Sequence, residues 1–502
     1  MTANVAVLLP LALTLILALT LRKTVLALGV GIVSGAFMLA SYNPLATLEY
    51  LAVTAGRQVY SGGSWQIWHL NVLTAMVLLG AMTQLLARGG AVNAFADWLY
   101  HRIRNGRQAR LGVVFLGWVV FIDGIFSCIA VGHVCQPLSQ RYAMPKEQIA
   151  YLVDSNASPL CSLLPFSSWG PYVMAILAGI ALLPVSPLQA FLEMAQLNFY
   201  AITVIGLSLL VAWSGRGFRG EKHKESSPEP VHLGNAWLLG LPMASLLLSS
   251  IGFTLWSGAV SSGSWNITEW LTHADIGGSM RNACILATLT SVVLLKLGGR
   301  PFSQLIRDIL SGIKGISFAI GILIFTWMIG AVIKDLGVAK LLAGWAGQLL
   351  SAHFLLAGTF LLCAVMAFTT GSSWGTFAIM LPIGGEIAVA VDVTMLIPAL
   401  SAVMAGAVFG DHCSPISDTS VLSATSSGCS PHSHVITQLP FAVIAALASL
   451  LGYQLTNLTI SGFAVWLIVT VTAVALFLLL TLLNGKFARS GELLEEGGTE
   501  VR

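Results

Sequence analysis

The sequence predicts an all-α polytopic membrane protein with about 11–13 transmembrane segments. Its mean hydropathy is +0.85, and 56% of its residues are hydrophobic while only 9% are charged. Apolar runs such as residues 5–21 and 464–483 are near or above the roughly 18 residues that a spanning helix needs. The alternating apolar and polar residues of an outer-membrane barrel are absent. We therefore expect a multi-pass protein of the cytoplasmic membrane, surrounded by membrane lipid.

One hydrophilic segment divides the chain near its midpoint. Residues 214–234 carry several basic side chains, and another basic segment covers residues 88–110. The positive-inside rule places both in the cytoplasm. We therefore expect a first transmembrane half over residues 1–213, a cytoplasmic linker over 214–234, a second half over 235–485 and a polar C-terminal tail over 486–502.

Composition and missing motifs argue against several other kinds of protein. The net charge of +3 comes from short loops between apolar helices, so we expect no nucleic-acid partner. The seven cysteines form no CxxC pair, which argues against a zinc or redox site. No Walker phosphate loop is present, so ATP does not drive a cycle through this chain. We expect no cofactor other than transported ions, and no enzyme, since residues 410–440 lack the GxSxG elbow that exposes a nucleophilic serine.

A polar stretch over residues 410–440 lies between strongly apolar segments. It contains two aspartates, three histidines, eight serines and three threonines. Polar groups cost several kcal/mol each in hydrocarbon unless they are satisfied internally. A polar stretch at this depth is therefore expected to line a cavity or to bind a ligand.

Interrupted apolar segments occur in both halves of the chain. Gly-broken segments at FIDG (121–124) and FTTG (368–371) are each followed by a segment rich in Asp, Ser and Pro. This pattern predicts two structural repeats in which Asp154 corresponds to Asp411. Discontinuous helices in corresponding positions present free backbone groups to ions and polar substrates at membrane depth.

Four aspartates, Asp123, Asp154, Asp411 and Asp418, are candidates for buried acids. A carboxylate at membrane depth can hold a proton, or a hard cation together with neutral oxygens. Exchange of Na⁺ for H⁺ needs such a site, and we expect Asp154 and Asp418 to face each other across it. For each aspartate, a role as a helix cap or an ion-pair partner stays open. The other candidate site residues carry mainly neutral oxygens: Ser155, Asn156, Ser158, Thr370, His412, Ser414, Ser417 and Thr419. The candidate Na⁺ ligands among these residues are Asp154, Asn156, Ser414, Asp418 and Thr419.

The histidines of the polar stretch favour hydrogen bonding over metal binding. His432 and His434 are two residues apart and do not share a helix face.

The motifs FIDGIFSCIAVG, YLVDSNASPL and GDHCSPISDTS resemble those of the NhaC-type sodium/proton antiporter family. The resemblance implies secondary transport of Na⁺ against H⁺, inverted repeats with re-entrant hairpins, and a transport domain that moves against a scaffold as an elevator. By fold analogy it also suggests a homodimer. The family usually has a second aspartate where this chain has Gly124. The residues that match its motifs are Asp123, Asp154, Asp411, His412, Ser414, Ser417, Asp418 and Thr419.

These observations predict a secondary-active transporter that exchanges Na⁺ for H⁺. The missing acid at Gly124 leaves an alternative open, in which a Na⁺- or H⁺-coupled carrier transports a small organic anion, such as malate or lactate, or an amino acid. A channel lined by the Gly-broken segments is a third interpretation.

Overall fold

The computed structural model describes residues 5–21, 23–180, 183–218, 235–266, 269–270, 273–338, 352–456, 458 and 461–497. Residues 219–234, most of the expected cytoplasmic linker, lie outside the described residues. So do residues 498–502 at the end of the expected polar tail.

The described elements of the first half are helices, apart from one short hairpin. In this hairpin two strands of two residues each, β1 and β2, pair antiparallel. The elements of the first half are η1 (Val5–Leu8), α1 (Leu9–Leu21), α2 (Thr24–Leu39), α3 (Pro44–Arg57), β1 (Tyr60–Ser61), β2 (Ser64–Trp65), α4 (Ile67–Arg88), α5 (Ala91–Tyr100), α6 (Gly106–Val119), α7 (Gly124–Arg141), α8 (Lys146–Cys161), α9 (Trp169–Leu177), α10 (Pro187–Gln196) and α11 (Phe199–Ser214).

The second half is helical throughout its described elements, and its last helix extends into the expected tail as far as Gly497. Its elements are α12 (Trp237–Ser262), α14 (Ile276–Leu297), α15 (Phe302–Asp335), α17 (Ala352–Thr370), α18 (Ser373–Val391), η2 (Val393–Met395), α19 (Leu396–Cys413), α20 (Asp418–Ser427), α21 (Pro431–Thr456) and α22 (Gly462–Gly497).

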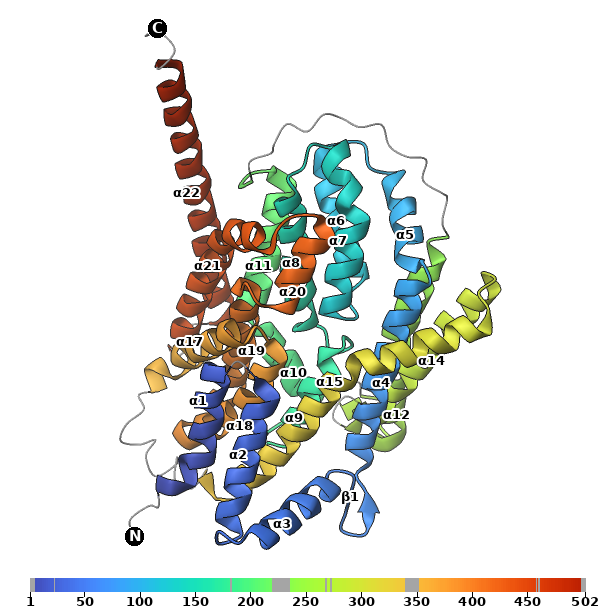
Figure 1. Ribbon diagram of the computed structural model, residues 1–502, viewed down its shortest axis with the longest axis vertical. Coiled ribbons are helices and arrows are strands. Elements are labelled where there is room, and N and C mark those ends of the chain that lie inside the picture. Colours follow the sequence, from blue (N-terminus) through green and yellow to red (C-terminus); the bar gives the residue numbers. More distant parts are fainter. Residues whose placement is uncertain are drawn as a thin grey trace.

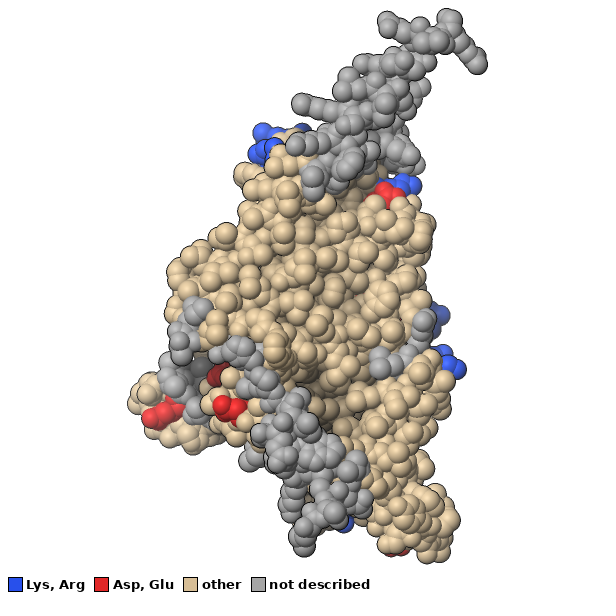
Figure 2. Space-filling model, turned by 90° about the vertical axis from the view of Figure 1, so that its left-hand side faces the viewer, with Lys and Arg blue, Asp and Glu red and all other residues tan. Residues whose placement is uncertain are grey.

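The apolar helices confirm the predicted polytopic all-α fold. Within the described ranges, eight helices are long and apolar enough to cross a membrane, or up to ten if each of two bent helix pairs is one span. The bends are 119° between α2 and α3 and 51° between α10 and α11, and three shorter apolar helices accompany these spans. The broad middle of the face in Figure 2 shows no Lys, Arg, Asp or Glu, as expected for a surface in contact with lipid.

The helices form two packed groups (Figure 1). In one, α4 packs against α14 and α15, and α12 packs against α14. The other contains α6–α8 and α11 of the first half and α17–α22 of the second. Contacts of α4 with α9 and of α15 with α18 join the two groups. This division fits a scaffold and a transport domain, and the elevator motion itself stays a prediction.

Each half contains the same sequence of helices around two breaks. The helical hairpin α6–α7 is followed by α8, a break and the short α9, while α17–α18 is followed by α19, a break and the short α20. The short helix of each half packs against the hairpin of the other half, α20 on α7 and α9 on α18 (Figure 1). This crossed packing is the arrangement expected for two repeats related by a pseudo-two-fold axis.

The predicted pairing of Asp154 with Asp411 within the repeats is wrong. The corresponding helices α8 and α19 end at Cys161 and Cys413. When these ends are matched, Asp411 corresponds to Pro159, and Asp154 lies two turns before the end of α8. The shared Ser-Pro pair misled the comparison, since Pro159 lies inside α8 whereas Pro415 follows α19.

Glycines bring α19 close to α17 and so position the break that follows. Gly406 and Gly410 lie one turn apart on α19, and a Cβ at either position would overlap a carbonyl oxygen of α17, that of Phe360 or Ala364. Both glycines are buried. The acid Asp411 directly follows the second of them.

Gly410→Ala is therefore expected to destabilise the protein by about 1–3 kcal/mol, because the helices must separate or strain to admit the methyl group. A melting curve of the purified protein in detergent measures the loss. The matched control is Gly358→Ala on α17, where a Cβ would meet no atom within 4 Å. Equal melting temperatures for the two variants would contradict the close packing.

Candidate functional site

All four breaks of the two repeats meet at one small cavity. They are residues 120–123 between α6 and α7, 162–168 between α8 and α9, 371–372 between α17 and α18, and 414–417 between α19 and α20. The cavity has a volume of about 30 Å³, enough for a water molecule or a dehydrated cation. Its lining residues are Asp123, Gly124, Ile125, Trp169, Gly371, Ser372, Ser373, Trp374, Asp411, Asp418 and Thr419.

Asp123 joins the two breaks of the first half. Its Oδ1 accepts a hydrogen bond from the backbone N–H of Phe126 at 2.9 Å and so caps α7. Its Oδ2 accepts from the hydroxyl of Ser168, in the other break, at 2.7 Å. The carboxylate is only partly buried, so one edge faces the cavity.

Asp411 joins the two breaks of the second half. Its Oδ2 accepts a hydrogen bond from Ser373 Oγ, at the start of α18, at 2.9 Å. Ser414, just past the end of α19, donates to the carbonyl of Phe368 at 2.7 Å. These two bonds hold the end of α19 against the tip of the α17–α18 hairpin.

Asp418 lies where the small cavity adjoins two larger ones. It is the first residue of α20 and is exposed, and it lines all three cavities together with Ser372. One larger cavity, of about 480 Å³, lies against α4, α7 and α15 and also contains Asp123 and His133. The other, of about 950 Å³, lies against α2 and α15. Next to Asp418, the hydroxyls of Ser417 and Thr419 are 3.0 Å apart.

Helix dipoles favour the negative charge of these carboxylates. The helices α7, α9, α18 and α20 all begin at the four breaks, and their N-termini carry partial positive charge. Side chains cap two of them, Asp123 on α7 and Ser372 on α18. Among the described residues, no three His, Cys, Asp or Glu side chains are placed to hold a metal ion together. Hydroxyl and carbonyl oxygens lie beside these carboxylates, and all three oxygen types are ligands of hard cations.

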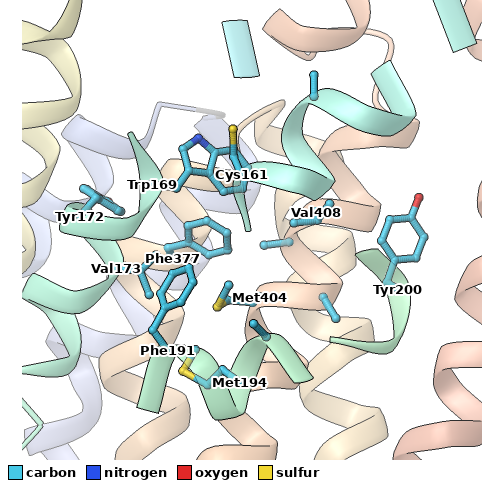
Figure 3. Packing of buried hydrophobic residues seen from close by; sticks show 14 of the residues in the cluster. Cys161, Trp169, Tyr172, Val173, Phe191, Met194, Tyr200, Phe377, Met404 and Val408 are labelled. Carbon is cyan, nitrogen blue, oxygen red and sulfur yellow. The ribbon is translucent and has the colours of Figure 1, made fainter. Parts of the chain in front are cut away.

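An aromatic layer closes the cavity on one side. Trp169 and Trp374, one from each half, lie with ring centres 6.0 Å apart in an edge-to-face arrangement. Tyr172 donates a hydrogen bond to the carbonyl of Trp374 at 2.8 Å. Figure 3 shows Trp169 above Phe377, with which it makes a second edge-to-face contact at 5.3 Å. Both tryptophans line the cavity.

Asp154 lies in a second, closed polar cluster. Its Oδ2 accepts hydrogen bonds from Ser420 at 2.9 Å, from Gln438 at 2.9 Å and from His434 Nε2 at 3.2 Å. His412 Nε2 is 4.0 Å from the same oxygen. Asp154 and these partners are buried, and none of them lines the three cavities.

His412 connects this cluster to α8 and α11. Its Nε2 is 3.2 Å from the hydroxyl of Ser155, and its Nδ1 is 2.7 Å from that of Tyr200. Gln438 donates a further hydrogen bond to the carbonyl of His412. The imidazole is therefore fixed at both nitrogens.

The expectation that Asp154 and Asp418 face each other across one site is wrong. Asp154 bonds Ser420, which lies two residues after Asp418, about 200° around α20. Asp418 therefore projects from one side of α20, while Asp154 of α8 contacts the other side.

The predicted Na⁺ ligands do not form one cage. Asp418 and Thr419 line the cavity, and Ser414 bonds a carbonyl beside it. Asn156 lies elsewhere, where it accepts from Trp118 Nε1 at 2.8 Å and donates to Ser208 at 2.9 Å. Thr370 bonds a carbonyl of its own helix and lines only the largest of the three cavities.

Sequence reasoning missed His434 and Gln438 as site residues. They lie four residues apart on α21, so both side chains point to the same face of the helix. That four-residue spacing is a signal in the sequence, whereas the two-residue spacing of His432 and His434 is not. Nothing local in the sequence pointed to Tyr200 or Ser373, since their partners come from distant helices.

Comparisons with known proteins identify the family. The sequence profile of the Na⁺/H⁺ antiporter family matches residues 160–458, more than half of the chain. The chain belongs to the Na⁺/H⁺ antiporter family. It is thus a secondary transporter and a multi-pass membrane protein, as the sequence predicted.

Individual relatives of this family member are similar over different lengths. An uncharacterized protein of Haemophilus influenzae is 34% identical over 91% of both chains. The malate-2H⁺/Na⁺-lactate antiporter of Bacillus subtilis is 27% identical over 30% of this chain and 32% of its own. The crystal structure of the YdaH transporter of Alcanivorax borkumensis, described as having an unusual topology, matches with a TM-score of 0.62 at 14% identity, covering 86% of this chain and 97% of that one. This last similarity establishes the fold.

At Gly124, beside Asp123, the packing leaves little room for a side chain. A Cβ at Gly124 would lie 3.2 Å from the hydroxyl of Ser158, so α7 and α8 pack tightly there. Ser158 is buried, and its hydroxyl has no hydrogen-bond partner within the described structure. Of the acids that line the cavity, Asp123 is the one that comes from the first half.

A GxSxG sequence does occur at residues 371–375, outside the polar stretch, with Ser373 at its centre. Here it joins two helices rather than a strand and a helix, so it is not a nucleophile elbow. The hydroxyl of Ser373 donates a hydrogen bond to Asp411 Oδ2 at 2.9 Å and lies 3.3 Å from the carbonyl oxygen of Ala407. The motif holds an acid in place.

Gln438→Leu should destabilise this family member by about 1–3 kcal/mol, because Asp154 loses an amide donor that no water can replace. Thermal unfolding in detergent measures the change. The control is Gln189→Leu, whose side chain is exposed and bonds only Glu193. A melting temperature as high as that of the control would show that Asp154 does not depend on this amide.

Proposed function

We propose that the protein exchanges Na⁺ for H⁺ across the cytoplasmic membrane, with the cation in the cavity where the four helix breaks meet. The observation that carries this proposal is the convergence of Asp123, Asp411 and Asp418 on a cavity of about 30 Å³. Three acids at membrane depth are costly and are best explained by a transported cation. Membership of the Na⁺/H⁺ antiporter family supports the same function.

The oxygens around the cavity suit a hard cation. Asp411 is buried and held by Ser373, while Thr419 presents its hydroxyl from the first turn of α20. Carboxylate, hydroxyl and carbonyl oxygens are the ligands that hard cations prefer. Both halves of the chain contribute to the wall, so a relative movement of their hairpins would open or close it.

Asp411→Asn should reduce Na⁺-dependent exchange at least about tenfold, because the amide keeps the shape but removes the charge that attracts Na⁺. The assay is dissipation of a pH gradient by added Na⁺ in proteoliposomes. Asp392→Asn is the control, since Asp392 is exposed and caps η2 away from the cavity. Full exchange by the Asp411 variant, or no Na⁺ response in the wild type, would refute the proposal.

A second candidate function is Na⁺- or H⁺-coupled transport of a small organic anion. The cavity of about 480 Å³ that adjoins Asp123 and Asp418 is larger than a dehydrated cation needs. The α20 N-terminus, which no side chain caps, could bind a carboxylate. The partly matching relative in Bacillus subtilis is named for malate and lactate.

Under this second function, malate or lactate should raise the melting temperature of the purified protein, and more in Na⁺ than in K⁺. Binding to the folded state stabilises it by mass action. Acetate at equal ionic strength is the control for a general effect of carboxylate. Equal melting curves in all of these media would leave only the exchange of Na⁺ for H⁺.

A further inference from the structure

The closed cluster around Asp154 holds a buried carboxylate that no Lys or Arg among the described residues neutralises. Asp154, Ser420, His434 and Gln438 have 0% exposure, and none lines a cavity. No Lys or Arg among the described residues bonds to Asp154. With neutral histidines, the cluster would carry one uncompensated negative charge away from water, which is costly.

One proton removes that charge. The imidazole of His434 lies 3.2 Å from Asp154 Oδ2, so protonation of the ring produces a neutral ion pair. Each member of this pair has one side-chain atom without a hydrogen-bond partner in the described structure, Asp154 Oδ1 and His434 Nδ1. These orphaned atoms are the places where a proton can arrive or leave without breaking an existing bond.

The cluster is linked to the cation cavity by two short segments. On α19, Asp411 lines the cavity while the next residue, His412, faces the cluster. On α20, Asp418 lines the cavity while Ser420 bonds Asp154. A change of charge at Asp154 therefore acts directly on the helix end and the first turn that form the cavity wall.

A partly exposed acid lies at the start of α8, on the helix that carries Asp154. Glu147 is partly exposed and accepts a hydrogen bond at 2.9 Å from Ser433, which directly precedes His434. Glu147 and Asp154 are seven residues apart on α8 and so lie on one face. Neither Glu147 nor Ser433 lines the three cavities, so a proton that passed between them and the cluster would not cross the cation site.

We propose that the Asp154–His434 pair is a proton-binding site separate from the cation cavity, and that α19 and α20 make its protonation and cation binding mutually unfavourable. This proposal rests on the proposed exchange of Na⁺ for H⁺ and specifies where the proton binds. The other titratable groups that interact with the pair are Cys128 on α7, Tyr200 on α11, and Asp411, His412 and Cys413 on α19.

Two separate sites leave a signature in the affinity for Na⁺. If both ions shared one carboxylate, the Kd for Na⁺ would rise about tenfold per pH unit on acidification without levelling off. Two coupled sites have a finite interaction, so the Kd rises and then reaches a plateau. Calorimetric titration of the wild-type protein with NaCl over about pH 6–8.5 distinguishes these two curves.

Variants locate the proton site. Asp154→Asn should still bind Na⁺, with a Kd that no longer changes with pH. It should keep the exchange of labelled Na⁺ for unlabelled Na⁺. Its Na⁺ uptake driven by a pH gradient should fall at least about tenfold. His434→Gln should do the same and serves if the first variant does not fold. His69→Gln is the matched control, since His69 stacks on Trp327 in the other helix group.

Several results would overturn the proposal. They are a wild-type Kd that rises without a plateau, a folded Asp154→Asn protein that binds no Na⁺, and one that keeps the pH dependence of the wild type. If both variants fail to fold, the wild-type titration still decides. A wild type that binds no Na⁺ at any pH would instead contradict the proposed function itself.

Discussion

The structure depends on one constraint: helices that break inside a membrane must satisfy their free ends and their acids within the protein. The chain meets this need by bringing all four breaks to one place. Asp123 joins the two breaks of the first half by accepting from Phe126 and Ser168, and Asp411 joins those of the second half through Ser373. The same groups that satisfy the breaks therefore line a cavity suited to a small ion.

The short helix α20 connects the cavity to the buried cluster around Asp154. One side of it presents Asp418 and Thr419 to the cavity, while the other presents Ser420 to the buried cluster. Only ten residues long, it packs between α7 and α8 of the opposite half. Ion binding and proton binding can thus be linked through one rigid element without a shared ligand. A relative shift of the two halves would move both sites together.

Much of the fold could be predicted from the sequence, because hydropathy and interrupted apolar segments are local signals. The polar stretch, the broken helices and the acids Asp123, Asp411 and Asp418 were all found in this way. The separation of Asp154 from the cavity was not, because it depends on which side of α20 faces α8. Tyr200 could not be found either, since its partner His412 lies 212 residues away in sequence and the two meet only through packing.

The most direct test of the central claim is the position of the bound ion. Cryo-electron microscopy of the protein in Na⁺ and in choline at equal ionic strength would show it. The account predicts Na⁺-dependent density in the cavity where the four breaks meet, near Asp411 and Thr419. It predicts no Na⁺-dependent density within the Asp154 cluster. Na⁺-dependent density beside Asp154, with none in the cavity, would contradict it.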